Sequence, residues 1–294
     1  MVSFKMLRSA TPGACLFLLG LGTLAACGGE AGSVDEEIGS AQGAISVGGG
    51  SAQACLVGTR SIRIAQRVTT FGALATDALS IESASIATGD ANINNSSPSQ
   101  VRISGAILNG NLKITGAAPS VANGELVNGG RIIGTVTTGA GSQATLATHA
   151  VPAGTVAVQV NSGPPVTRAP GNYGAVQVNG SRLTLTGGTY NVASLTLNAG
   201  AQLVFDTSAG PININVQGTT SFNGGTVSVV GSGAVSLYSN SSSPNAVTVN
   251  AGVGSVPLTI VAPNGGVVIG SRNTILGCVG GKDVSFEPDS HQHE

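Results

Sequence analysis

The sequence predicts an all-β protein whose folded part is a right-handed parallel β-helix. Two observations favour this fold. From about Cys55 onward, short stretches alternate apolar and polar residues, which is typical of strands that bury one face. Asparagine and glycine separate these stretches, and both residues tolerate the positive φ angles that tight turns need.

The turn residues recur at repeat-like intervals in the second half of the chain. Asn179, Asn198, Asn223 and Asn250 are separated by 19, 25 and 27 residues. Periods of this length are typical of stacked units, because one unit cannot bury its apolar face alone. An antiparallel sandwich is the competing fold, but it favours tighter hairpins and buried aromatic residues, and aromatic residues make up 3% of this chain. We therefore predict a β-helix with asparagine stacks at its corners.

The N-terminus is predicted to be a lipoprotein signal peptide over residues 1–26. Lys5 and Arg8 precede the apolar run "ACLFLLGLGTLAA", which is too short to span a membrane. The segment ends in "LAAC", which resembles the lipobox of bacterial lipoproteins. That resemblance implies that Cys27 is lipidated and becomes the mature N-terminus, and Gly28 after it favours the outer membrane. The alternative is an ordinary signal peptide cut just before a free Cys27.

Composition divides the remaining chain into four predicted segments. Residues 27–54 form an acidic, glycine-rich and flexible tether, and residues 55–138 form a first β-helical block. Residues 139–170 contain Pro152, Pro164, Pro165 and Pro170 and are predicted to cross between blocks, because proline is poorly tolerated in central strands. Residues 171–294 form the second block and a polar tail. The apolar spacing within Thr69–Ala84 predicts an irregular or short helical excursion.

Several stretches of the folded part resemble a family of β-helical domains. These are "APGNYGAVQVNG", "GGTYNVASLTLNAGAQLVF", "IVAPNGGVVIG" and "GCVGGKDVSFEP". Domains of this kind, of unknown function, occur in bacterial surface lipoproteins and in some pilus-associated proteins. A looser similarity connects the chain to bactofilins, the polymer-forming β-helix proteins, although the lipobox and the proline-rich crossing depart from that pattern. The resemblance implies the fold and supplies no catalytic residues.

The charged residues argue against an enzyme. Only 9% of the chain is charged, and between Pro170 and Ser271 the charged residues are Arg182 and Asp206. Glycoside hydrolysis needs two carboxyl groups held across one bond, and this stretch supplies a single acid. Asp206 precedes "TSAGP" and is interpreted as a turn-capping residue. We predict no catalytic residues.

The sequence also predicts no metal, cofactor or nucleic acid. The C-terminal "HQHE" places His291 and His293 close together, but a frayed polar tail explains them better than a metal site. A net charge of -1 gives no basic surface for nucleic acid.

The predicted function is that of a lipid-anchored cell-envelope protein with a rigid β-helical rod, structural or adhesive and non-enzymatic. Its predicted location is the outer membrane, with the surface and periplasmic sides both left open. Its predicted partners are the membrane, through the N-terminal lipid, and a cell-surface polysaccharide or protein. Two alternatives are a polysaccharide-active lyase or hydrolase, in which Asp206 or Glu125 would act, and a polymer-forming scaffold.

Two cysteines remain in the predicted mature chain, Cys55 and Cys278. Simple stacking of about ten rungs would separate them by tens of ångströms, too far for a disulfide. Both nevertheless begin similar stretches, "CLVGTRSIRI" and "CVGGKDVSF". If the crossing segment runs back along the rod, the last rung meets the first, and a bridge would add about 4 to 5 kcal/mol in the chain-entropy model. The alternative is two separate buried thiols.

Overall fold

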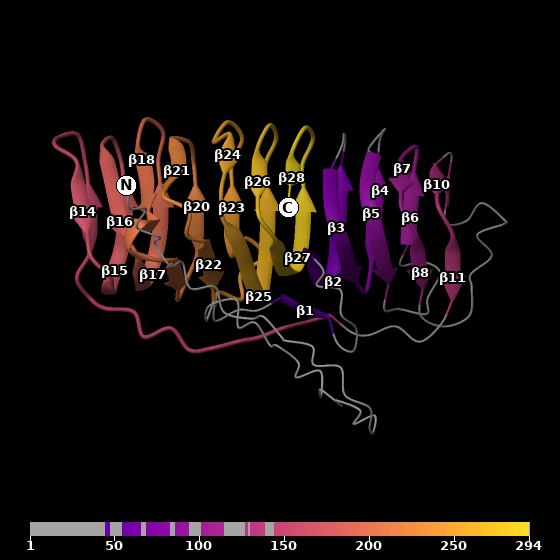
Figure 1. The fold of residues 1–294 in the computed structure, drawn as a ribbon, viewed down its shortest axis with the longest axis horizontal. Coiled ribbons are helices and arrows are strands. Elements are labelled where there is room, and N and C mark those ends of the chain that lie inside the picture. The colour runs from indigo at the N-terminus through magenta and orange to yellow at the C-terminus, as the bar shows by residue number, and fades with distance from the viewer. Residues whose placement is uncertain are drawn as a thin grey trace, which may run out of the picture. The chain divides into compact units, whose positions relative to one another are not determined.

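The computed structural model describes residues 45–47, 55–65, 69–82, 86–93, 101–114, 127–128, 130–138 and 144–293. Strands make up most of these ranges, and they pair side by side in parallel to form a β-solenoid (Figure 1). No α-helix occurs in these ranges. The structure thus confirms the predicted all-β parallel solenoid.

An N-terminal block and a C-terminal block make up the solenoid. The strands of the N-terminal block are β2 (Leu56–Ala65), β3 (Thr69–Thr76), β4 (Leu79–Glu82), β5 (Ile86–Ile93), β6 (Val101–Ser104), β7 (Ile107–Asn109), β8 (Leu112–Ile114), β9 (Val127–Asn128), β10 (Arg131–Ile133) and β11 (Val136–Thr138).

The C-terminal block is longer and contains one short 3₁₀ turn, η3 (Thr207–Ala209). Its strands are β13 (Val158–Val160), β14 (Val166–Arg168), β15 (Gly171–Val178), β16 (Arg182–Thr186), β17 (Gly188–Leu197), β18 (Gln202–Asp206), β19 (Ile212–Val216), β20 (Thr220–Phe222), β21 (Thr226–Val230), β22 (Val235–Ser239), β23 (Val247–Val249), β24 (Ser255–Val256), β25 (Thr259–Ile269), β26 (Thr274–Leu276), β27 (Val279–Phe286) and β28 (His291–His293).

The order of the rungs in space differs from their order along the chain. Strand β2, which opens the N-terminal block, pairs in parallel with β27, which lies near the end of the C-terminal block. From this contact the N-terminal block extends to β10 and β11, while the C-terminal block begins at β13 and winds back toward β27. Figure 1 accordingly shows the yellow end of the chain beside indigo β2 and β3. We call the contact between β2 and β27 the joint.

The hydrophobic core continues through the joint without a break. Leu56, Ile62 and Ile64 of β2 pair with Val279, Val284 and Phe286 of β27, and all six side chains are buried. They belong to one apolar cluster that includes residues of both blocks. The joint therefore buries apolar surface in the same way as the contacts between consecutive rungs.

One corner of the C-terminal block carries a ladder of asparagine side chains. From Asn179 onward, each amide nitrogen donates to the amide oxygen of the rung before it, at 2.7 to 3.0 Å, along the series Asn161, Asn179, Asn198, Asn223 and Asn250. Every member directly follows the last residue of a strand. The rungs differ in length, yet their asparagines align because the extra residues lie at other corners.

A second asparagine ladder supports the segment that connects the two blocks. Asn191 donates to Asn172, and Asn215 donates to Asn191. The Oδ1 atom of Asn215 lies 3.3 Å from Nε2 of His149, whose ring stacks on Tyr238 with centroids 3.8 Å apart. The connecting segment therefore docks on an outward column of the C-terminal block.

We call this connecting segment, residues 144–157, the strap. It begins with β12 (Ala144–Leu146), which pairs antiparallel with β1 (Ile45–Val47). Near its end, the N–H of Gly154 donates to the carbonyl of Tyr173 and the N–H of Gly174 donates to the carbonyl of Val156. Figure 1 shows the strap running along the lower edge of the C-terminal block toward β14.

The structure corrects two expectations about local structure. Thr69–Ala84 was expected to be irregular or helical, yet β3 and β4 occupy most of it. Backbone partners on both sides override the helical spacing, because β3 pairs with β2 and with β5.

The predicted crossing 139–170 also contains part of the C-terminal block. Strands β13 and β14 pair with β15 and β16, so the block begins at Val158. Pro164 and Pro165 lie in the corner between β13 and β14, where a missing backbone N–H breaks no strand pairing.

Replacing an internal member of the asparagine ladder is expected to destabilise the protein. Asn198 donates one hydrogen bond and accepts another, so Asn198→Ala should lower the free energy of unfolding by about 1 to 3 kcal/mol. Asn161, at the end of the ladder, makes one such bond, and Asn161→Ala should cost about half as much. Urea unfolding of both variants measures the difference. Equal losses would contradict a role for the ladder.

Candidate functional site

The joint is the candidate site because it gathers the cysteines and most of the paired charges of the described chain. Its geometry begins at Gly58, which pairs with Gly281. A Cβ atom on Gly58 would lie 2.3 Å from the carbonyl oxygen of Ser61, so the bulge between these residues requires glycine. Glycine three residues after each cysteine thus gives the two strands the same corner.

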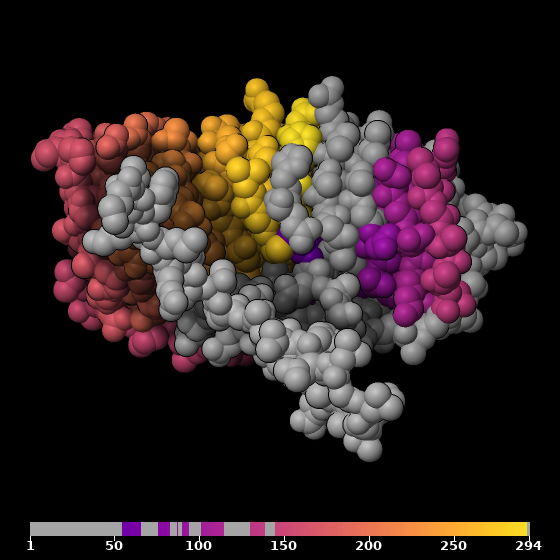
Figure 2. Space-filling model, viewed as in Figure 1, coloured from indigo at the N-terminus to yellow at the C-terminus, as the bar shows by residue number. Residues whose placement is uncertain are grey.

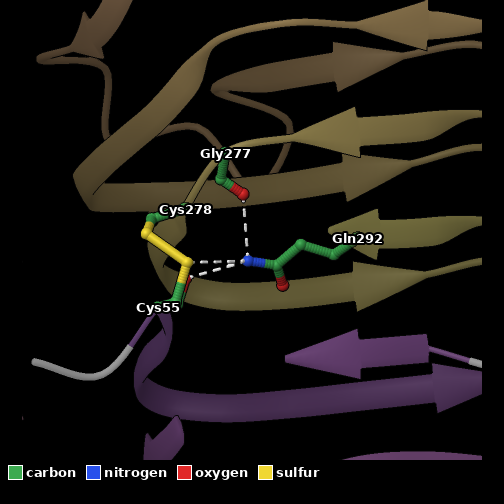
Figure 3. The surroundings of a disulfide bond; sticks show 4 residues. All are labelled: Cys55, Gly277, Cys278 and Gln292. Atoms are coloured by element: carbon green, nitrogen blue, oxygen red, sulfur yellow. Dashed lines mark hydrogen bonds between the residues drawn. A yellow bond between two sulfur atoms is a disulfide. The ribbon is translucent and has the colours of Figure 1, made fainter. Parts of the chain in front are cut away.

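The structure joins Cys55 and Cys278 in a disulfide, with the two Cα atoms 4.5 Å apart (Figure 3). The bridge spans 223 residues of sequence but a single step between neighbouring rungs. The strap runs back along the C-terminal block, which is the route that the folded-back topology requires.

The disulfide occupies a corner that hydrogen bonds hold in the outer rungs of the N-terminal block. There, Asp90 Oδ1 accepts from the backbone and side-chain nitrogens of Asn111, and Asn111 Oδ1 accepts from the backbone and hydroxyl of Thr135. Strand pairing from β2 through β3, β5, β8 and β11 places these residues in the same column as Cys55. At the joint, a covalent bond replaces the polar contact.

A buried amide packs against the bridge. The side chain of Gln292 on β28 is 0% exposed, and its Nε2 donates to the carbonyls of Cys55 and Gly277, each at 3.0 Å. The same nitrogen lies 3.4 Å from Cys55 Sγ. Gln292 therefore connects the last strand to both sides of the bridged corner.

Ion pairs flank the disulfide on the outer face of the joint. Arg60 pairs with Asp283, and Ser61 donates to the same carboxylate at 2.6 Å. Arg63 of β2 lies 3.5 Å from Glu287, which follows β27, and 3.5 Å from Glu82 of β4, so it connects its own rung to the rungs on both sides. Arg60 and Asp283 each lie five positions after a cysteine, and this shared offset could have identified the pair from sequence.

Two of these carboxylates have lowered pKa values. Burial alone would raise the pKa of Asp283, but hydrogen bonds from Arg60 and Ser61 and the charge of Arg60 hold it below the ordinary value. The hydroxyl of Ser80 is the main cause of the lowered pKa of Glu82, and Arg63 contributes to it. Both carboxylates are therefore favoured in the ionised form by contacts of the folded state.

The remaining predicted site residues do not assemble into a chemical site in the described ranges. Asp206 accepts from the N–H of Ser208 and caps η3, and hydrogen bonds from the side chain and the backbone of Ser208 lower the pKa of Asp206. The lipidation candidate Cys27 and the acid Glu125 lie outside the described residues. His291 lies on β28, in the fold rather than in a frayed tail.

The described part of the chain lacks a metal-binding cluster and a membrane-spanning helix. No three His, Cys, Asp or Glu residues are grouped as metal ligands within those ranges. The described residues form no helix of the length and apolar character that crossing a membrane requires.

A shallow groove of about 300 Å³ lies where one sheet of the solenoid is interrupted. Strand β21 ends one sheet and β24 begins the next, with no ladder between them. The lining includes Val229, Pro257 and Leu258 and contains no charged residue. It supplies no acid or base for chemistry.

Comparison with known proteins finds one related domain. A family model described as a domain of unknown function, DUF7305, matches residues 153–257. The match begins in the strap and extends through β24, so it covers most of the C-terminal block. Comparisons with curated proteins and with solved structures give no match. The similarity carries no activity, and the resemblance to surface lipoproteins and bactofilins stays an expectation.

The bridge is expected in the isolated protein. Mass analysis of unreduced peptides should yield a linked pair that contains Cys55 and Cys278. Replacing both by serine should lower the free energy of unfolding by about 4 to 5 kcal/mol, because the closed loop is long. Reduced and alkylated wild-type protein is the control and should lose a similar amount. Two free thiols in the oxidised protein would contradict both the bridge and the folded-back topology.

Stability should fall in acid because of the joint. The folded state lowers the pKa values of Asp283 and Glu82, so their contribution is present above the ordinary values of 3.8 and 4.5 and is lost as the pH falls below them. Urea midpoints measured between about pH 6 and pH 3 should show this decline. Asp283→Asn should flatten the decline. Asp77→Asn is the control of opposite sign, since burial raises the pKa of Asp77.

Proposed function

We propose that this protein is a lipid-anchored component of the bacterial cell envelope that presents a rigid, non-enzymatic β-solenoid for structural or adhesive contact. The observation that carries this proposal is the joint. A disulfide, a buried amide and two ion pairs fasten two blocks that the chain does not connect directly at that point. Such reinforcement suits a protein whose task is to keep its shape.

The contacts of the described carboxylates support a non-enzymatic role. Asp283 and Glu82 are bound by arginine and serine, Asp90 holds a corner, and Asp206 caps a turn. Each of these four acids thus has a structural partner, whereas a lyase or hydrolase needs acidic groups free to meet a substrate.

An outward column of uncharged side chains in the C-terminal block favours the proposal that the binding partner is uncharged. Strand pairing places uncharged hydroxyl and amide side chains one rung apart, at about 4.8 Å, in the series Gln159, Gln177, Thr196, Ser221 and Thr248. Figure 2 shows the close-packed surface of this block, coloured from red to yellow. A neutral cell-surface polysaccharide or an uncharged protein surface suits such an array better than a charged polymer does.

The tether would hold the rod at an internal point. Residues 27–54 lead to Cys55, which lies at the joint between the two blocks. An anchor on Cys27 would therefore connect to the interior of the stack of rungs, and both terminal rungs would stay available for contact.

Lipidation of Cys27 is expected. Cells fed a fatty-acid analogue should label the protein, and Cys27→Ser should abolish the label and release the protein from the membrane. Cys15→Ser is the matched control, since Cys15 lies within the apolar run ahead of the "LAAC" box, and it should leave labelling unchanged. A Cys27→Ser protein that stays labelled and membrane-bound would contradict the anchor.

Two further experiments test the envelope role and the absence of enzymatic activity. Surface protease on intact cells shows whether the rod faces outward. Incubation of purified protein with acidic and neutral polysaccharides should give binding without cleavage. Cleavage that Asp206→Ala or Glu125→Ala abolishes would replace this proposal with an enzyme.

A further inference from the structure

The two sulfur atoms of the joint have unequal surroundings. Cys55 is 1% exposed and lies against Gln292, whereas Cys278 is partly exposed at the corner that follows Gly277. Gly277 has no side chain to cover this corner, and its φ of +152° favours glycine there. Figure 3 shows Cys278 and Gln292 on opposite sides of Cys55 Sγ. An incoming group therefore reaches Cys278 more readily than Cys55.

The buried sulfur has a hydrogen-bond donor beside it. Gln292 Nε2 is held by the carbonyls of Cys55 and Gly277, which fixes the nitrogen 3.4 Å from Cys55 Sγ. Three acceptors around one amide group assign this atom as nitrogen rather than oxygen. An N–H donor stabilises a thiolate more strongly than a neutral disulfide sulfur, because hydrogen bonds to charged groups are the stronger ones.

From these two asymmetries we infer that Cys278 is the site at which a dithiol oxidoreductase opens and closes this disulfide, and that Cys55 is the leaving and resolving thiol. Thiol–disulfide exchange depends on access to the attacked sulfur and on the stability of the leaving thiolate. Both factors select Cys278 for attack and Cys55 for departure. The inference is independent of the lipid anchor and of the adhesive role.

Opening proceeds in two balanced steps. A thiolate of the reduced partner attacks Cys278 Sγ, the Cys278–Cys55 bond breaks, and Cys55 leaves as a thiolate next to Gln292. The partner's second thiolate then attacks its own sulfur in the mixed disulfide and releases Cys278. The partner becomes a disulfide, the joint gains two thiols after proton uptake, and two electrons have moved from partner to joint. Closing is the reverse sequence with an oxidised partner.

Opening the disulfide changes how the two blocks are held together at the joint. The strap connects the blocks along the chain, and the disulfide is the covalent link that the described residues place directly between β2 and β27. Exchange at Cys278 thus controls whether β2 and β27 are covalently linked at the joint.

Glutathione tests the direction of exchange on the oxidised wild-type protein, since its single thiol leaves the mixed disulfide in place. After brief exposure in native buffer, acid quenching and alkylation, peptide mapping should place glutathione on Cys278 and the alkyl group on Cys55, with a preference of roughly tenfold or more. Glutathione mainly on Cys55, an equal distribution, or exchange that requires denaturant would overturn the inference.

Two sets of variants test each part of the inference separately. In Cys55→Ser the remaining Cys278 thiol should react with a thiol reagent under native conditions, and in Cys278→Ser the remaining Cys55 thiol should be protected; the opposite pattern would overturn the site. Gln292→Met should slow glutathione exchange several-fold, although simple destabilisation would speed it. Gln202→Met on β18 is the control and should leave the rate unchanged. An unchanged or faster rate in Gln292→Met would remove the role given to Gln292.

Discussion

The stacking of β2 on β27 is the contact on which the rest of the structure depends. In a solenoid each rung buries its apolar face against its neighbours, so a separate block would expose core and unpaired backbone at both ends. Here the last rung of one block covers the first rung of the other, and Leu56, Ile62 and Ile64 complete a core that includes Val279, Val284 and Phe286. The strap, the disulfide and the ion pairs all follow from this arrangement, because each connects segments that lie far apart in the sequence.

The same stacking explains why the chain has so little charge. Parallel in-register pairing places equivalent residues of successive rungs about 4.8 Å apart, and like charges at that distance repel. Asparagine avoids this conflict, because its amide both donates and accepts and so can bond to a copy of itself, as it does from Asn161 to Asn250. Opposite charges are compatible where rungs of different sequence meet, and the ion pairs of Arg60 and Arg63 lie at or beside the joint. The low charge of the chain is thus explained by the stacking of the fold and needs no functional site to account for it.

Sequence alone could predict the parts of the structure that repeat. Alternation predicted the strands, and recurrent asparagines predicted a corner ladder, because both signals come from contacts between equivalent positions. It could not place features that depend on one unique contact. In Thr69–Ala84, strand pairing on both sides of β3 overrides the helical spacing of the sequence. Strand β13 was not predicted because it lies in a proline-rich segment, and its pairing with β15 determines where the block begins. Gln292 and His149 acquire partners only when segments distant in sequence meet, so no local pattern distinguishes them.

The topology also explains why the joint, rather than another rung, carries a covalent bond. Strand β2 cannot pair with β27 until 223 residues separating the cysteines have been placed, whereas neighbouring rungs pair across about 20 residues. Closing so long a loop is entropically the most costly contact in the solenoid, and a cross-link removes most of that cost from the unfolded chain. Hydrogen bonds of the kind between Asp90 and Asn111 suffice where the loop is short. The same corner column therefore uses polar contacts in the outer rungs and a disulfide at the one step where chain connectivity gives no help.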